Sequence, residues 1–531
     1  MSQSDQADTS DLGGNWIQRP AAMAVIGLLL GIITKVLFHH HVPGLSYPLW
    51  SLACVIGLLA AARIESIKPA GQELILAVLI LVFSAFFAVR REPLTVFLNM
   101  VFPLFLFGLW IRTFRWNRLA DLNWLDYGLS MVLVPMEMLF RPWGVASRAR
   151  RRLVSDHNAR RPFMAVLRGL VLALPILVVF TALLASADLI FGDAVHELID
   201  WLDWPLMVSW FESVLIIVVA GLVTLGAIVT ALQPADDRQT VFEGRSLPRL
   251  LGLIESGVLL GAVDGLFMIF TLIQFRYLFG GEANINAAGY TYAEYARRGF
   301  GELVAVAFLS LGLIWLLSMV SRRDTRTAHR IFNGLSTLMV ALLFVILASA
   351  FKRLLLYEQA YGFTNLRLYT HIAIVWMGLL FAGFLIILAK QRLGLFPLLT
   401  LAAAAGFTLT LNVINPEGLI VRQNLARAEI SGELDLEYFG WLTSDSIPAL
   451  VSGARNSDLE ESDPLWAVLA CHQFRLETRL ENRGWPSFHV SDWLAQRSLA
   501  QVGTDLAGYE LQDGWVTDEE SMGELYFCPL R

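Results

Sequence analysis

Tyrosine, glutamate and arginine occur together in two short segments of the chain, and these residue types could bind an anion. The first segment is AGYTYAEYARRGFGELVAV and the second is KRLLLYEQAYGFTNLRLYTH. An arginine guanidinium binds carboxylate or phosphate through two parallel hydrogen bonds. The two segments could therefore pair with each other, or they could hold an anionic ligand such as a lipid head group. The candidate site consists of Glu294, Tyr295, Arg297, Arg298, Glu302, Tyr357, Glu358, Tyr361 and Arg367.

Two carboxylates lie within the apolar run 251–275, which is LGLIESGVLLGAVDGLFMIFTLIQF. A carboxylate at mid-bilayer costs roughly 2.5–3.5 kcal/mol on insertion scales, so it usually faces a protein interior or water. Glu255 and Asp264 are nine positions apart and would point to opposite sides of a straight helix. We therefore expect Asp264 to face the bundle interior, either as a neutral, bonded group or as part of a transport pathway.

Histidine and cysteine give little support for a metal site. His39, His40 and His41 could bind a transition metal, although a short histidine run at a membrane interface is more often incidental. Neither CxxC nor HExxH occurs, so we expect no metal and no cofactor. Cys471 and Cys528 could form a disulfide in an exported domain, or they could be two buried thiols.

About eleven apolar runs must position these residues. Hydrophobic residues make up 56% of the chain and charged residues 16%, against about 45–50% and about 25% in soluble domains. Most runs have the length that a helix needs to cross a bilayer. The shorter segment 126–140 contains Pro135 and Glu137, which favours an interfacial or re-entrant helix. The runs are 20–38, 47–63, 73–89, 93–111, 164–186, 210–232, 251–275, 301–320, 331–351, 371–390 and 395–414.

The positions of lysine and arginine predict the orientation of the chain. The loop 141–163 contains the cluster Arg148, Arg150, Arg151 and Arg152, which places it in the cytoplasm. Residues 415–531 hold 20 Asp and Glu against 8 Arg, a balance of -12 that indicates different surroundings. With eleven spans, the N-terminus lies inside and the acidic tail outside, in the periplasm of a Gram-negative bacterium. Two outward connections break the rule, because they contain Arg90, Arg91, Lys352, Arg353 and Arg367.

These features predict an all-α polytopic membrane bundle with a small, mostly helical exported domain. Asn415 and Pro416 should end the last span, and Ser444 or Asp445 could cap a helix that starts near Ile447. We also expect the two Tyr/Glu/Arg segments to meet at the outer mouth of the bundle. The predicted parts are a polar cytoplasmic N-terminus 1–19, four spans in 20–111, a basic loop with an interfacial helix in 112–163, a seven-helix core 164–414 and an exported domain 415–531.

Three stretches also resemble a known family. They are YAEYARRGFGELVAV, LYEQAYGFTNLRLYT and NVINPEGLIVRQNLARAEISGELDLEYFGWLTSDSIPAL. Together they resemble a family of bacterial multi-pass proteins catalogued only as a domain of unknown function (4173/4153 type), over roughly residues 160–450. The resemblance implies an inner-membrane helical protein whose last span leads into an exported segment. It implies no catalytic residues.

Three classes of function fit these features. The first is a non-enzymatic envelope protein whose outer face recognises a partner or ligand. The second is a transporter of a small or anionic solute, but no inverted repeat is apparent. The third is a transferase acting on a lipid-linked substrate, but the first outer loop, HHHVPGLSY, contains no acidic residue. The sequence favours the first class, with membrane lipids, an envelope protein or an anionic lipid as partners and no nucleic acid.

Overall fold

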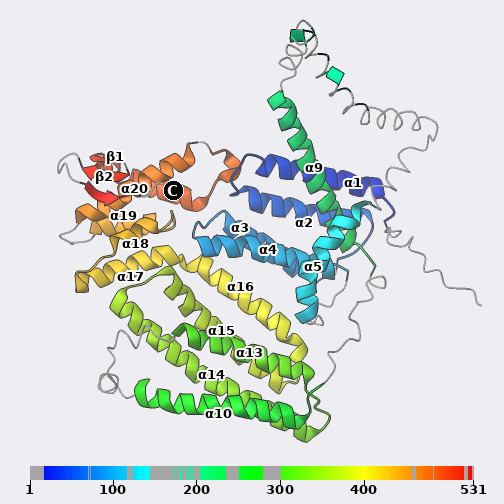
Figure 1. Ribbon diagram of the computed structural model, residues 1–531, viewed down its shortest axis with the longest axis vertical. Coiled ribbons are helices and arrows are strands. Elements are labelled where there is room, and N and C mark those ends of the chain that lie inside the picture. The colour runs from blue at the N-terminus through cyan, green and yellow to red at the C-terminus, as the bar shows by residue number, and fades with distance from the viewer. Residues whose placement is uncertain are drawn as a thin grey trace, which may run out of the picture. The chain divides into compact units, whose positions relative to one another are not determined.

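Long apolar helices dominate the structure (Figure 1). The computed structural model describes residues 17–69, 71, 73–115, 124–143, 204–234, 250–278, 300–456, 462–481, 483–512, 514–518 and 524–528, with isolated positions between 173 and 194. Two compact units are present. The first comprises Met1–Val78, Phe105–Asn117 and Gly128–Arg238, and the second comprises Leu79–Leu104, Arg118–Tyr127 and Gln239–Arg531.

Within these described residues, nine helices are long and apolar enough to cross a membrane, and each coincides with a predicted run. Of the other two predicted runs, 73–89 forms the shorter helix α3 (Glu73–Phe87), and 164–186 lies mostly outside the described residues. The predicted interfacial segment forms α5 (Trp124–Phe140), with Pro135 inside the helix. The prediction of an all-α polytopic membrane protein is confirmed.

The first unit is built on close packing of α1 (Pro20–Phe38) against α9 (Trp204–Ala231), with α2 (Ser46–Ile64) beside them. The sequence GLLLG places Gly27 and Gly31 on one face of α1. A Cβ atom on Gly31 would lie 2.3 Å from the carbonyl oxygen of Ile217, so only glycine allows this approach of the two backbones. Small residues four apart are a common device for packing helices in membranes, where burial of apolar surface gives no driving force between helices.

The second unit contains the remaining spans, except that the end of α4, from Phe105, belongs to the first unit. A hydrogen bond from the Arg322 amide to the Leu251 carbonyl, at 2.8 Å, joins the start of α10 to the end of α13. The longest helix, α14, begins after Thr325, whose side chain accepts from the Ala328 amide, and ends before Gly362, where φ is 76°. The spans are α4 (Pro93–Thr113), α10 (Leu253–Leu278), α13 (Phe300–Val320), α14 (Arg326–Tyr361), α15 (Asn365–Ala389) and, after the short η4 (Leu393–Leu395), α16 (Phe396–Ile414).

A compact C-terminal domain follows α16 in the same unit. Asn415 adopts a left-handed conformation, with φ 53° and ψ 82°, and Pro416 starts the next helix. The domain buries its own apolar core, in which α20 packs against the strands (Figure 1). Its helices are α17 (Pro416–Ser431), α18 (Leu436–Trp441), α19 (Ile447–Asn456), α20 (Ser462–Leu480), η5 (Trp485–Ser487), α21 (Val490–Ala500) and α22 (Gly503–Leu506).

The end of the chain forms a small sheet that the sequence did not predict. Strands β1 (Tyr509–Gln512), β2 (Trp515–Asp518) and β3 (Glu524–Phe527) pair antiparallel in the order β1-β2-β3. Cys528, just after β3, forms a disulfide with Cys471 of α20, with a Cα–Cα distance of 5.6 Å. Both cysteines lie in the apolar core of the domain, so the bond fixes the sheet to α20.

Candidate functional site

The turn between α3 and α4 contains two arginines that contact the C-terminal domain. The Nε of Arg90 donates to the Asn412 carbonyl oxygen at 2.9 Å, and Arg90 also forms an ion pair with Asp445 at 3.5 Å. The amides of Arg91 and Glu92 donate to the same Asp445 carboxylate, at 2.7 and 2.9 Å. Two of the predicted exceptions to the positive-inside tendency therefore have partners in the structure.

Arg91 belongs to a cluster in which three arginines surround one carboxylate. Its Nε donates to Asp492 Oδ2 at 3.0 Å. Arg479 and Arg483, from the end of α20 and the turn after it, each lie 3.6 Å from the same carboxylate. The Ser444 hydroxyl donates to Asp492 Oδ1 at 2.8 Å. All four charged side chains are largely buried, so screening by water is weak.

The charges in this cluster do not balance. Burial alone would raise the pKa of Asp492, but the hydrogen bonds and charge of Arg91, with Ser444 and Arg479, hold that pKa below its usual value. The carboxylate is therefore ionised. Burial lowers the pKa of the Arg483 guanidinium, and repulsion from Arg91 adds to the effect. Three cations around one anion leave two excess positive charges, which favour binding of a further anion.

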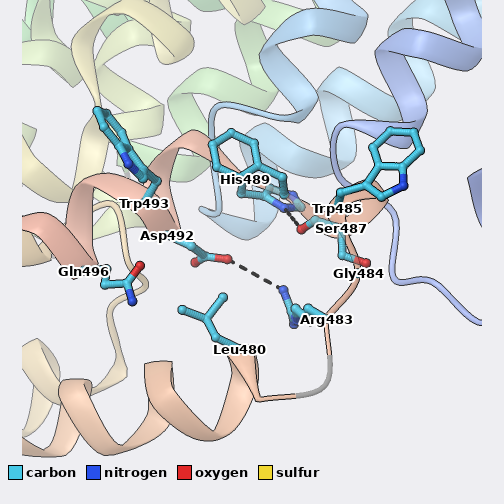
Figure 2. Close-up of a pocket in the computed structure, with 10 residues that line it drawn as sticks. Leu480, Arg483, Gly484, Trp485, Ser487, His489, Asp492, Trp493 and Gln496 are labelled. Atoms are coloured by element: carbon cyan, nitrogen blue, oxygen red, sulfur yellow. Dashed lines mark hydrogen bonds and ion pairs between the residues drawn. The ribbon is translucent and has the colours of Figure 1, made fainter.

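A pocket of about 180 Å³ opens beside this cluster (Figure 2). Arg483 and Asp492 point toward each other across it, and Trp485 and Trp493 lie on opposite sides of it. The aromatic rim is exposed, with 60% of Trp485, 45% of Trp493 and 43% of Phe488 accessible to solvent. Arg483 Nη1 is buried and, among the described residues, donates no hydrogen bond, although it forms an ion pair with Asp492. The pocket thus has one arginine and one aspartate of the cluster in its wall and an aromatic entrance.

This pocket lies at the end of the apolar helix α3. The Val490 amide, at the start of α21, donates to the Ala88 carbonyl just after α3, at 2.8 Å. The rings of Phe87 and His489 are 6.2 Å apart. Burial lowers the pKa of His489 to about 4, and the charge of Arg91 adds to this, so the imidazole is neutral near pH 7. Among the described residues that line the pocket, the positive charge therefore comes from Arg483 and not from His489.

The second predicted segment forms the turn between α14 and α15. The guanidinium carbon of Arg367 lies 3.9 Å from the centre of the Tyr357 ring, a cation–π contact. Arg367 also donates to the carbonyl of Tyr361 at 3.1 Å and to that of Gly362. Glu358 pairs with His371, its Oε1 lying 3.0 Å from Nδ1. These contacts hold the turn together without an Arg–Glu pair between Arg367 and Glu358.

The first predicted segment is largely beyond the described part of the chain. Glu294, Tyr295, Arg297 and Arg298 lie outside the described residues, and Glu302 is exposed in the first turn of α13. That the two segments meet in space therefore stays a prediction. Of the two intramembrane carboxylates, Glu255 is exposed in the first turn of α10, whereas Asp264 is only 3% exposed.

A buried glutamate fixes the start of the C-terminal domain. Glu417 Oε2 accepts from the amide and hydroxyl of Thr443, at 2.8 and 2.6 Å. Burial raises the pKa of Glu417 to about 8, although the hydrogen bonds from Thr443 oppose this shift. Glu417 therefore keeps its proton in the folded protein at neutral pH.

We expect Glu417→Gln to remove a pH dependence of stability. The unfolded carboxyl loses its proton near pH 4.5 and the folded one near pH 8. Between these pH values the unfolded state binds fewer protons at Glu417 than the folded state does. Glu417 therefore lowers the free energy of unfolding as pH rises, by up to about 1.4 kcal/mol per pH unit. Unfolding midpoints of the detergent-solubilised protein, measured across this window, should fall more steeply for wild type than for the variant. Parallel curves would contradict the assignment.

In the first unit, Glu212 lies close to two residues of the histidine run. Ligand atoms of His39, His40 and Glu212 lie within 4.8 Å of one another, and two of these residues are exposed. Among the described residues this is the single group of three that could hold a metal ion. Glu212 was not predicted, because it lies far along the chain in α9.

Sequence reasoning also missed the arginine cluster. Arg479 and Arg483 are four positions apart at the end of a helix and precede a break at Gly484, Trp485 and Pro486. This pattern alone is common on protein surfaces. The partner Arg91 lies 401 positions from Asp492, so only the tertiary structure unites them.

Comparison with known proteins gives one match. The family model described as "Domain of unknown function (DUF4153)" matches residues 77–453, which confirms the resemblance found in the sequence. The match includes the 90–92 turn and Asp445 but ends before the pocket segment 480–496. Neither the search of curated proteins nor the search of solved structures found a match.

Proposed function

We propose that this chain, which belongs to the family described as "Domain of unknown function (DUF4153)", is a membrane-anchored binding protein for a phosphate-bearing lipid head group. The family carries no indicated activity, so the proposal depends on the site. Its main support is the cluster of three arginines around Asp492, from which Arg483 and Asp492 line a pocket with an aromatic rim. We infer a binding role and not an enzymatic one.

Arginine and tryptophan suit the two parts of such a ligand. Planar guanidinium groups bind phosphate oxygens through paired hydrogen bonds, and buried arginines keep their charge. Tryptophan is enriched in membrane proteins at the membrane–water interface. The contact between Val490 and Ala88 holds the pocket at the end of α3, which favours a lipid over a soluble anion.

Several features support an extracytoplasmic position for the C-terminal domain. The turn at residues 88–92, the α14–α15 turn and the end of α16 all contact this domain, so they share its side of the membrane. Arg322, Arg323, Arg326, Arg330, Lys390 and Arg392 lie at the opposite ends of these helices, which suits a cytoplasmic face. A disulfide is also typical of exported domains. We propose the inner membrane of a bacterium, with the N-terminus inside.

Lipid binding by the full-length protein tests this function. Delipidated protein in detergent is titrated with phosphatidylglycerol, with phosphatidylcholine and with inorganic phosphate, and bound lipid is quantified by native mass spectrometry. We expect phosphatidylglycerol to bind, and Arg483→Gln to weaken it about ten- to hundredfold, because a hydrogen bond to a charged group contributes about 1.5–3 kcal/mol. Trp485→Ala should weaken binding of the lipid more than it weakens binding of inorganic phosphate.

Matched substitutions elsewhere on the domain serve as controls. Arg422→Gln and Trp441→Ala change the same residue types at exposed positions that do not line the pocket. These variants should bind as wild type does. Binding of inorganic phosphate without the lipid would show a soluble-anion site and contradict the proposal, as would equal binding by wild type and Arg483→Gln.

A further inference from the structure

The buried face of α10 is unusually polar for a membrane helix. Six residues form this face, at positions 256, 260, 264, 267, 271 and 274, and α10 packs chiefly against α14. Four of the six are polar, namely Ser256, Asp264, Thr271 and Gln274. The opposite face of α10 consists mainly of exposed apolar residues, as expected where a helix meets lipid. The polar residues are thus concentrated where two helices meet.

Neighbouring helices extend this polar interface toward the C-terminal domain. Gln274 Oε1 accepts hydrogen bonds from Ser349 Oγ and Arg353 Nη2 of α14, both at 2.9 Å. Farther along α14, Glu358 pairs with His371 of α15. Polar groups therefore run from the middle of α10 to the end of α14 that contacts the C-terminal domain.

Asp264 is a buried carboxyl group without a partner among the described residues. It lies near the middle of the 22-residue apolar part of α10, between the buried Leu260 and Phe267. Within the described part of the chain, neither Asp264 oxygen has a hydrogen-bond partner, whereas Glu358 Oε1 is paired with His371. An ionised, unpartnered carboxylate in such surroundings is strongly disfavoured, so Asp264 needs a bound cation or a proton.

We propose that the interface of α10 and α14 binds a proton at Asp264. Binding converts the Asp264 carboxylate into a neutral acid with a proton taken from water, and release returns it. A metal ion would need several oxygen or nitrogen ligands. Asp264 belongs to no group of three potential metal ligands among the described residues.

The charged groups on the helices around Asp264 can be named from the described residues. On α14 the buried ones are Arg353 and Glu358, and the less buried ones are Arg326, His329, Arg330 and Lys352. On α15 they are Arg367 and His371, and the buried face of α13 contributes Ser310 among apolar residues. Arg353 donates to Gln274, which lies on the same buried face of α10 as Asp264, so a fixed positive charge adjoins this face.

Carbodiimide labelling of the full-length protein in membrane vesicles tests proton binding at Asp264. Dicyclohexylcarbodiimide partitions into the bilayer and forms a stable adduct with a protonated carboxyl, but not with a carboxylate. We measure labelling from pH 5 to pH 9 and expect Asp264 to be labelled at the acidic end, with the labelled fraction falling about tenfold per pH unit once the pH exceeds its titration point. Peptide mass spectrometry gives the labelled fraction at each carboxyl.

Two substitutions complete the test. Asp264→Asn should abolish the label on this peptide, and Glu255→Gln, in the first turn of the same helix, should leave it unchanged. Labelling of Asp264 that is constant across this pH range would mean a permanently neutral structural acid, and absence of labelling would mean a carboxylate with no proton site. Either result would overturn the proposal.

Discussion

Asp492→Ala should destabilise the C-terminal domain by about 3–5 kcal/mol, the cost measured when one partner of a buried ion pair is removed. Arg91, Arg479 and Arg483 would then remain close together without the carboxylate that neutralises them. The Asp492 side chain is only 4% exposed, so water cannot replace it well. Thermal unfolding and limited proteolysis of the full-length protein in detergent would measure the loss.

Two further variants show whether loss of the charge cluster causes the destabilisation. Asp505→Ala removes an exposed carboxylate from the same domain and should change stability by less than about 0.5 kcal/mol. Arg91→Met should cost less than Asp492→Ala, because Asp492 keeps Arg479 and Arg483 as partners. Equal unfolding midpoints for Asp492→Ala and Asp505→Ala would show that the cluster does not stabilise the domain.

Removing the disulfide by Cys471→Ala should cost about 4 kcal/mol, because the bond closes a loop of 57 residues in the unfolded chain. We expect the strands β1–β3 to become sensitive to protease first, since Cys528 follows β3 directly. Cys54→Ala, which removes the free cysteine within α2, should leave the protease pattern unchanged. A Cys471→Ala protein with wild-type protease resistance would contradict this expectation.

The same bond provides a check on orientation. In intact cells without reductant, Cys471 and Cys528 should resist alkylation, and after reduction they should react with a membrane-impermeant reagent added outside the inner membrane. This follows if the domain is exported, because cytosolic thiols are kept reduced. Reaction with the impermeant reagent only after the inner membrane is opened would reverse the proposed orientation.

Run length predicted most spans, because a bilayer requires apolar helices of a narrow range of lengths. Helix ends were less predictable. The apolar run 331–351 lies within α14, which extends from Arg326 to Tyr361. The helix begins after Thr325 and ends before Gly362, and the polar residues on either side of the apolar run do not interrupt it. The strands were missed because each has only four residues, too few for an alternating pattern to be recognised.

The site was harder to predict than the fold. Ser444 and Asp445 are suitable residues for a helix cap, but their side chains bind Asp492 and the 90–92 turn. Arg90 and Arg91 conflicted with the positive-inside tendency when only sequence neighbours were considered. Their partners, Asp445 and Asp492, lie more than 350 positions away, and no local pattern connects residues at that distance.

The long separation of Arg91 from Asp492 has a consequence for biogenesis. Arg91 is synthesised 401 residues before Asp492, which at about 5–20 residues per second is roughly 20–80 s earlier. During that interval the α3–α4 hairpin has two arginines in its turn without their carboxylate partners. The apolar residues of its helices must hold the hairpin in place until Asp445 and Asp492 have been synthesised and the C-terminal domain has folded.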